Sequence, residues 1–132
     1  AGTPPIAAAI GLGEAINYLE SVGLDNIARH EDMLTVKATE ALMQIDNLTV
    51  YGTAPNKAGV ISFNVKGVHP HDMGTLLSDD GVAVRAGHHC AQPVMIRYKV
   101  PATTRASFYL YNTLEDIDRL VMSVRGAQKL FN

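Results

Sequence analysis

Residues 48–65 read LTVYGTAPNKAGVISFNV and contain two short apolar runs separated by a turn-rich link. The runs, 48–51 and 60–65, are rich in β-branched and aromatic residues, which favour strands over helices. The link between them, 52–59, holds two glycines and a proline, which favour a turn. We therefore predict two strands joined by a short connection, which is typical of an antiparallel sheet.

Helical patterns flank these strands on both sides, and the last segment carries the clearest apolar stripe. Asn112 or Thr113 can cap that closing helix, and acidic residues follow in its first turn. In chain order we expect helices at 5–18 and 25–44, strands at 48–51 and 60–65, a helix at 71–77, a strand at 82–85, a partly helical loop at 86–101, a strand at 104–111 and the closing helix from 114. The predicted fold is α+β, with a mostly antiparallel sheet of about four strands covered by helices.

The composition favours one compact domain over residues 1–132. Apolar residues make up 47% and charged residues 18% of the chain, which is enough for a packed core. The net charge of −2 gives no general reason to bind nucleic acid or an anionic membrane, and no apolar run is long enough to span a bilayer. The single cysteine excludes an intrachain disulfide and suits a reducing compartment, so we expect a cytoplasmic protein.

The stretch VAVRAGHHCAQP, residues 82–93, concentrates the reactive side chains. A predicted strand leads to a glycine, two histidines and Cys90, and loops that follow strands often display reactive groups. Positive charge from Arg85, His88 or His89 would raise the thiolate fraction of Cys90. The alternative is a buried, unreactive Cys90, since lone cysteines often behave as small apolar residues. The polar, glycine-containing surroundings favour a functional thiol.

Arg105 is a second candidate site residue. It begins a predicted strand in which apolar and polar residues alternate, and an arginine there can bind a carboxylate through two parallel hydrogen bonds. The alternative for both Arg105 and Arg85 is an ordinary solvated arginine on the polar face of the sheet.

Two other cysteine or histidine chemistries fit the sequence poorly. His69, His71, His88, His89 and Cys90 could be proposed as zinc ligands, but adjacent side chains do not readily converge on one tetrahedral ion. No CxxC or HExxH motif is present, so we expect no metal site. A papain-like hydrolase lacks its signature around the cysteine.

Three stretches of the chain resemble one family. RAGHHCAQP (85–93), RASFYLYNT (105–113) and AGTPP (1–5) are similar to the group II cysteine desulfurases, the SufS and selenocysteine lyase type. The similarity extends from residue 1 to about residue 131, and the Arg-x-Gly-His-His-Cys signature is specific. The resemblance implies the C-terminal small domain of a fold-type I enzyme that depends on pyridoxal 5′-phosphate (PLP).

The resemblance also implies an activity and residue roles. Enzymes of this type are normally homodimers that convert L-cysteine to L-alanine and pass a persulfide to a sulfur-acceptor protein for iron–sulfur cluster assembly. Cys90 matches the residue that takes the sulfur, and Arg105 matches the residue that binds the substrate carboxylate. Arg85 is expected to support the active site. A mobile loop at 86–101 could then carry the persulfide outward.

The remaining motif residues have less direct roles. His88 and His89 match the motif histidines, for which the resemblance implies proton handling. Thr3 resembles a residue that reaches the PLP phosphate of the partner subunit.

The resemblance places the PLP lysine in a large domain that precedes these residues. None of the five lysines lies in the expected lysine motif, so we expect the 132 residues alone to be inactive. Residues 1–20 would then form the helix that links the two domains. Two alternatives stay open, a selenocysteine lyase on the same scaffold and a non-catalytic module that docks a sulfur acceptor.

Overall fold

The two strands within residues 48–65 form one side of a four-stranded sheet. The computed structural model describes residues 2–131. The strand order is β1-β2-β4-β3, and all neighbouring strands are antiparallel, which confirms the predicted α+β fold. The elements in chain order are α1 (Ile6–Val22), α2 (Leu24–Met43), β1 (Leu48–Tyr51), β2 (Val60–Val65), α3 (Pro70–Asp79), β3 (Arg85–Gly87), α4 (Gln92–Tyr98), β4 (Thr103–Ser107) and α5 (Leu114–Phe131).

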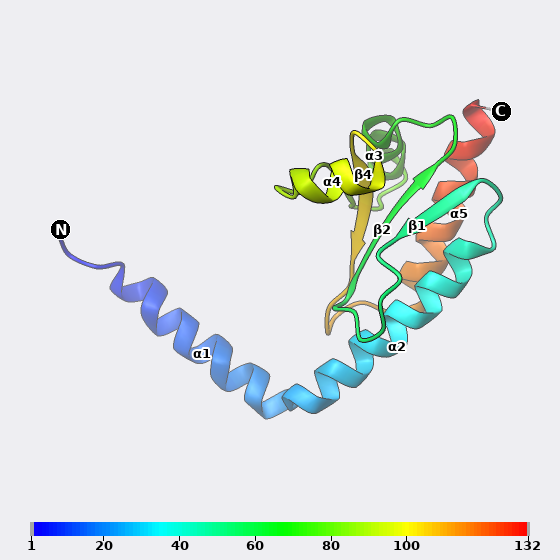
Figure 1. Ribbon diagram of the computed structural model, residues 1–132. Coiled ribbons are helices and arrows are strands. Elements are labelled where there is room, and N and C mark those ends of the chain that lie inside the picture. The colour runs from blue at the N-terminus through cyan, green and yellow to red at the C-terminus, as the bar shows by residue number, and fades with distance from the viewer. Residues whose placement is uncertain (1, 132) are drawn as a thin grey trace.

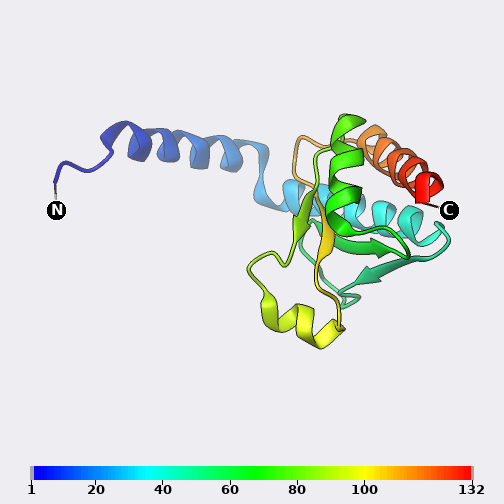
Figure 2. The same ribbon diagram turned by 90° about the horizontal axis from the view of Figure 1, so that it is seen from above.

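The sheet separates two unequal layers of helices. Helices α2, α3 and α5 cover one face, and the short helix α4 lies on the other side (Figures 1 and 2). The alternation along β2 explains this division. Ile61, Phe63 and Val65 are buried in the core beneath the three helices, whereas Ser62 and Asn64 are half-buried on the opposite face. One face of the sheet is therefore apolar and the other is polar.

The core forms where three helices meet the apolar face of the sheet. Leu34 and Leu42 of α2, Leu77 of α3 and Val124 of α5 have no exposed surface and pack around Phe63. Apolar side chains on α2 and α5 recur every three or four residues, so each helix presents one apolar stripe to the sheet. This packing fixes the position of β2 and β4 at the centre of the domain.

Helix α1 lies apart from this core. It buries none of its residues and projects away from the sheet (Figure 1). Gly23, with a φ of 91°, separates it from α2. Its exposed apolar side chains include Ile6, Ile10, Leu12 and Ile16. Within residues 2–131, no helix has the length and apolarity needed to cross a bilayer.

The predicted bounds of two strands are wrong. The third strand occupies Arg85–Gly87 instead of 82–85, because the Val82 amide donates to the Leu77 carbonyl at 2.7 Å and holds that segment against the end of α3. The last strand ends at Ser107 instead of residue 111. Beyond it, the Phe108 amide still bonds to the Gly59 carbonyl, and residues 109–112 then form a turn.

The expected loop at 86–101 contains the helix α4, Gln92–Tyr98. Pro93 lies in its first turn, where a missing amide hydrogen costs no helical bond. The predicted cap of the closing helix is confirmed at Thr113. Its hydroxyl accepts from the Asp116 amide at 3.4 Å, and the Asp116 carboxylate accepts from the Thr113 amide at 3.0 Å. These bonds, with one from Asn112, lower the pKa of Asp116.

Replacing the central core residue should cost most of the stability of the domain. We expect Phe63→Ala to lower the free energy of unfolding by about 3–5 kcal/mol, because the truncated side chain leaves a cavity. Met122→Ala removes an exposed side chain from α5 and should change stability by less than about 0.5 kcal/mol. Urea unfolding monitored by circular dichroism measures both values. Equal losses in the two variants would contradict this account of the core.

Candidate active site

Two arginines face each other across the β3–β4 pair. Arg85 and Arg105 are directly opposite in the register, and Arg105 is also opposite Ser62 of β2. Directly opposed residues share a face of the sheet, so all three lie on the polar face, away from the core. Among residues 2–131 the one ion pair joins Lys37 to Glu40, and neither arginine has a carboxylate partner. Two like charges placed opposite each other repel, which makes this face suitable for an anion.

His89 connects the cysteine-bearing turn to β4. Its Nε2 lies 3.0 Å from both the carbonyl oxygen and the hydroxyl oxygen of Thr103. A carbonyl can only accept, so Nε2 carries the proton and Nδ1 holds a free lone pair. Burial lowers the pKa of His89, and the positive charges of Arg105 and Arg85 lower it further, while the bond to Thr103 acts in the opposite direction. His89 is therefore a neutral imidazole at pH 7.

Cys90 lies at the tip of a tight turn and its side chain is exposed. Its amide donates to Nδ1 of His88 at 3.2 Å, and the Ala91 amide donates to the His88 carbonyl at 2.9 Å. His89 and Cys90 both have φ of 57°, in the left-handed region that residues with a Cβ rarely adopt. Consecutive left-handed residues cost about 1–3 kcal/mol each, and such strain concentrates at functional sites.

The structure brings most of the predicted site residues together. Arg85 and Arg105 share one face, His89 lies close enough to both for their charges to lower its pKa, and His88 and Cys90 occupy the same turn as His89. Cys90 is exposed on this domain, so it is not a small apolar residue buried in the core described here.

Thr3 does not join this group within the chain. It is exposed and precedes α1, and the N-terminal end of that helix lies far from the sheet and α4 (Figure 1). A role for Thr3 in a site would therefore have to involve groups outside the described residues.

Sequence reasoning missed two residues of the polar face, Asn64 and Thr103. Thr103 has no exposed surface and accepts the His89 bond, and Asn64 donates to the Ala102 carbonyl at 2.9 Å. The period of two along 60–65 already separated Asn64 from the apolar residues of that strand. That Thr103 of β4 lies opposite Asn64 could be identified only from the strand register.

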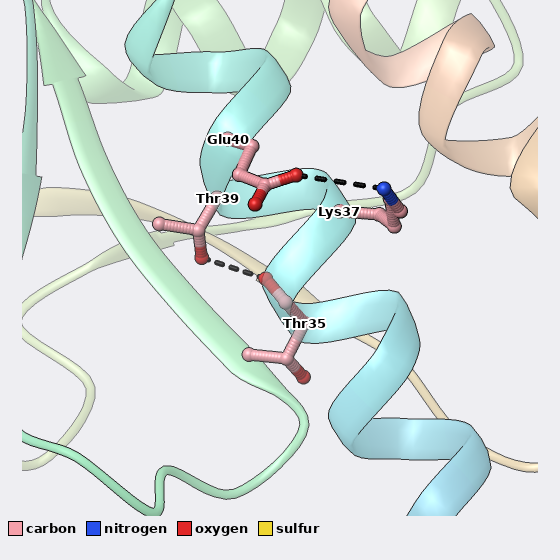
Figure 3. A network of polar contacts seen from close by, with 4 residues as sticks. All are labelled: Thr35, Lys37, Thr39 and Glu40. Atoms are coloured by element: carbon pink, nitrogen blue, oxygen red, sulfur yellow. Dashed lines mark hydrogen bonds and ion pairs between the residues drawn. The ribbon is translucent and has the colours of Figure 1, made fainter.

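A hollow on another part of the surface lacks histidine, cysteine and arginine side chains. A cavity of about 540 Å³ is enclosed by the outer side of α2 and the β1–β2 connection. In its wall the Thr39 hydroxyl donates to the Thr35 carbonyl, and Lys37 pairs with Glu40 nearby (Figure 3). These polar groups are satisfied within the helix, and no histidine, cysteine or arginine lines the cavity.

The proposed zinc ligands do not form a cluster. Across the described part of the chain, no group of three or more histidine, cysteine, aspartate or glutamate side chains could hold a metal ion. The rings of His69 and His71 stack on each other with centroids 5.4 Å apart, and His69 caps the start of α3.

The lowered pKa of His89 predicts a pH dependence of stability. In the unfolded chain His89 binds a proton near pH 6.5, whereas in the folded chain it binds that proton only at a lower pH. The free energy of unfolding should therefore fall as pH decreases below about 6.5. We expect His89→Gln to lose less stability than the wild type between pH 7.5 and pH 5.5. Urea unfolding at both values measures the difference, and His71→Gln, an exposed site, is the control. An unchanged pH dependence in His89→Gln would contradict the assignment.

Comparison of the sequence and structure with known proteins identifies the family of this chain. The aminotransferase class-V family model matches residues 1–120. A probable cysteine desulfurase of Halalkalibacterium halodurans is 54% identical over 130 residues, covering 98% of this chain and 32% of the relative. One from Streptomyces coelicolor is 50% identical, covering 99% of this chain and 32% of the relative. The chain thus spans about a third of the length of these relatives.

Solved structures agree with the sequence relatives. The cysteine desulfurase CsdA from Escherichia coli superposes with a TM-score of 0.92 at 36% identity, covering 100% of this chain and 33% of that one. The apo cysteine desulfurase from Thermococcus onnurineus NA1 gives 0.88 at 43% identity, covering 99% and 32%. The chain therefore belongs to the aminotransferase class-V family and is similar over nearly its whole length to about a third of the length of cysteine desulfurases.

Proposed function

We propose that this chain is the substrate-binding and sulfur-accepting domain of a PLP-dependent cysteine desulfurase. The observation that carries the proposal is the exposed Cys90 thiol on a strained turn, tied by His89 to the strand that bears Arg105. The similarity to cysteine desulfurases at 54% and 50% identity supports the same reaction. The whole enzyme would convert L-cysteine to L-alanine.

Arg105 binds the substrate carboxylate in this proposal. Its guanidinium is half-buried, has no acidic partner in the described residues, and faces away from the core. Two parallel N–H donors match the two oxygens of a carboxylate, and partial burial strengthens the pairing by excluding water. Arg85, directly opposite, adds positive potential and its repulsion is relieved when the anion binds.

Cys90 accepts the sulfur. Its thiolate forms an S–S bond to the substrate sulfur, while the C–S bond breaks and its electron pair stays on the carbon that becomes the methyl carbon of alanine. PLP, when bound, supplies the electron sink that weakens this C–S bond. Because Cys90 is exposed, the same atom could present the persulfide to a sulfur-acceptor protein, as iron–sulfur cluster assembly requires.

The residues of this chain fit one wall of a PLP site. The two unpaired guanidinium groups suit an anionic amino acid held beside the cofactor, but none of the five lysines lies on β3, on β4 or in the turn at 87–91. We infer that the cofactor lysine belongs to the part of the enzyme outside this chain. Thr3 would contact the PLP phosphate in the partner subunit of a homodimer.

The exposed apolar helix α1 supports the proposed domain organisation. A helix with no buried residue and several exposed isoleucines is unusual in a free domain, because large apolar patches mark contact surfaces. We propose that residues 1–132 belong to one small domain and that α1 links it to the preceding two thirds of the enzyme and packs against them. The free thiol favours a reducing, cytoplasmic location.

Replacing Cys90 should abolish turnover without unfolding the enzyme. In the full-length enzyme we expect Cys90→Ala to release no alanine above background and to gain no sulfur mass on this chain, because the sulfur acceptor is gone. Its Tm should not fall, since the side chain is exposed. Wild-type alanine release by this variant would refute the proposal. Faster turnover of L-selenocysteine than of L-cysteine by the wild type would favour a selenocysteine lyase.

Arg105→Ala should raise the KM for L-cysteine about 100-fold, because a bidentate charged pairing of about 2.7 kcal/mol is lost. Arg125→Ala, an exposed arginine on α5 at the other side of the sheet, is the matched control and should leave KM unchanged. Steady-state kinetics on the full-length enzyme measures both. Equal effects in the two variants would remove Arg105 from the site. Partner binding with no turnover in the wild type would instead favour an interaction module.

A further inference from the structure

Three buried polar atoms lack a hydrogen-bond partner, and all three come from one region. Within residues 2–131 they are Oδ1 of Asn64, Nδ1 of His89 and Nε of Arg105. Asn64 and Arg105 share the polar face of the sheet, and His89 contacts Thr103 on that face. Buried polar groups in proteins nearly always have partners, and an unmade bond costs about 1–3 kcal/mol. These atoms must therefore be satisfied in the working enzyme.

The orientation of the Asn64 amide is fixed by its other bond. Its Nδ2 donates to the Ala102 carbonyl at 2.9 Å, so the remaining atom, Oδ1, is an acceptor. The Nε–H of Arg105 is a donor. One unpartnered acceptor and one unpartnered donor thus lie on the same face of neighbouring strands.

The register puts the two side chains within reach of each other. Phe63 is opposite Thr104, so the next residue, Asn64, is opposite Thr103, and Arg105 is its diagonal neighbour on β4. Diagonal neighbours have their Cβ atoms about 7–8 Å apart, a gap that a long side chain can close. On the other neighbouring strand, β3, the residue opposite Arg105 is Arg85, which is itself a cation and cannot accept the Nε–H.

Neither atom bonds to the other in the arrangement described here. We propose that Asn64 is a positioning residue for Arg105 in the working enzyme, where a small shift of the two side chains lets Oδ1 accept the Nε–H directly or through one water. This inference rests on the proposed function. Holding Nε fixes the guanidinium plane and leaves the terminal nitrogens free for the substrate carboxylate. An arginine side chain loses about 2 kcal/mol of rotamer entropy when it is ordered. Ordering it before substrate arrives lowers the cost of binding.

His89 is the competing acceptor. Its Nδ1 also lacks a partner and its ring lies near Arg105, but the two contacts from Nε2 to Thr103 restrict where Nδ1 can point. A coupling of Arg105 to His89 instead of Asn64 is therefore a distinct outcome, and the experiment separates the two.

A double-mutant cycle in the full-length enzyme tests the assignment. We expect Asn64→Ala to raise the KM for L-cysteine about tenfold with kcat changed less than about twofold, because a single bond to the clamp is lost. In an Arg105→Lys background, which lacks the Nε–H, Asn64→Ala should add less than about twofold. Thr49→Ala, at the exposed position opposite Asn64 on β1, is the matched control and should leave KM unchanged.

The possible results distinguish the inference from the proposed function. If Arg105→Lys leaves KM unchanged, the proposed function fails. If Arg105→Lys raises KM but the effect of Asn64→Ala is the same in both backgrounds, or if His89→Ala shows the coupling instead, the role of Asn64 is wrong. Should Asn64→Ala lower the Tm too far for kinetics, a crystal structure of the wild-type holoenzyme decides. Oδ1 bonded to Nε, or both bonded to one water, is expected, and any other partner for Nε overturns the assignment.

Discussion

The register between β4 and its neighbours is the constraint on which the site depends. Thr104 and Ala106 of β4 face the core, so Thr103 and Arg105 must face the other way. A slip of one residue would turn the Arg105 guanidinium into the apolar layer and leave Ala106 on the polar face. The burial of Phe63 and Ile61 on the neighbouring strand prevents that slip. Core packing on one face therefore determines the charge pattern on the other.

The site itself is assembled from segments far apart in the chain. β2 contributes Asn64, β3 contributes Arg85, and β4 contributes Arg105, while the turn after β3 displays Cys90. Among residues 2–131, His89 makes the side-chain hydrogen bonds that join this turn to β4. Because α4 follows the turn at once, the cysteine is held between two regular elements and its position is defined by both. This arrangement suits a nucleophile that must meet a substrate bound on the neighbouring strand.

Much of this could be predicted from the sequence, and the failures have physical causes. The runs at 48–51 and 60–65 and the stripe of α5 carry strong local periodicity, and they form as expected. Residues 82–84 are apolar for another reason, since Val82 and Val84 pack against the core near the end of α3 and pair with no strand. The motif indicated Cys90 and Arg105, but Asn64 carries no motif. Its relation to Arg105 arises from strand register, which no local pattern encodes.

The left-handed backbone at residues 89 and 90 lowers the stability of the turn that carries the Cys90 thiol and the His89 imidazole. Glycine adopts φ near 57° without penalty, and asparagine tolerates it better than most residues, so either would relieve strain at this turn. Neither offers a sulfur atom or an imidazole. Selection for thermostability alone would therefore favour Gly or Asn at these two positions and remove the thiol and the imidazole, whereas the proposed function requires a sequence that keeps both at the cost of a strained turn.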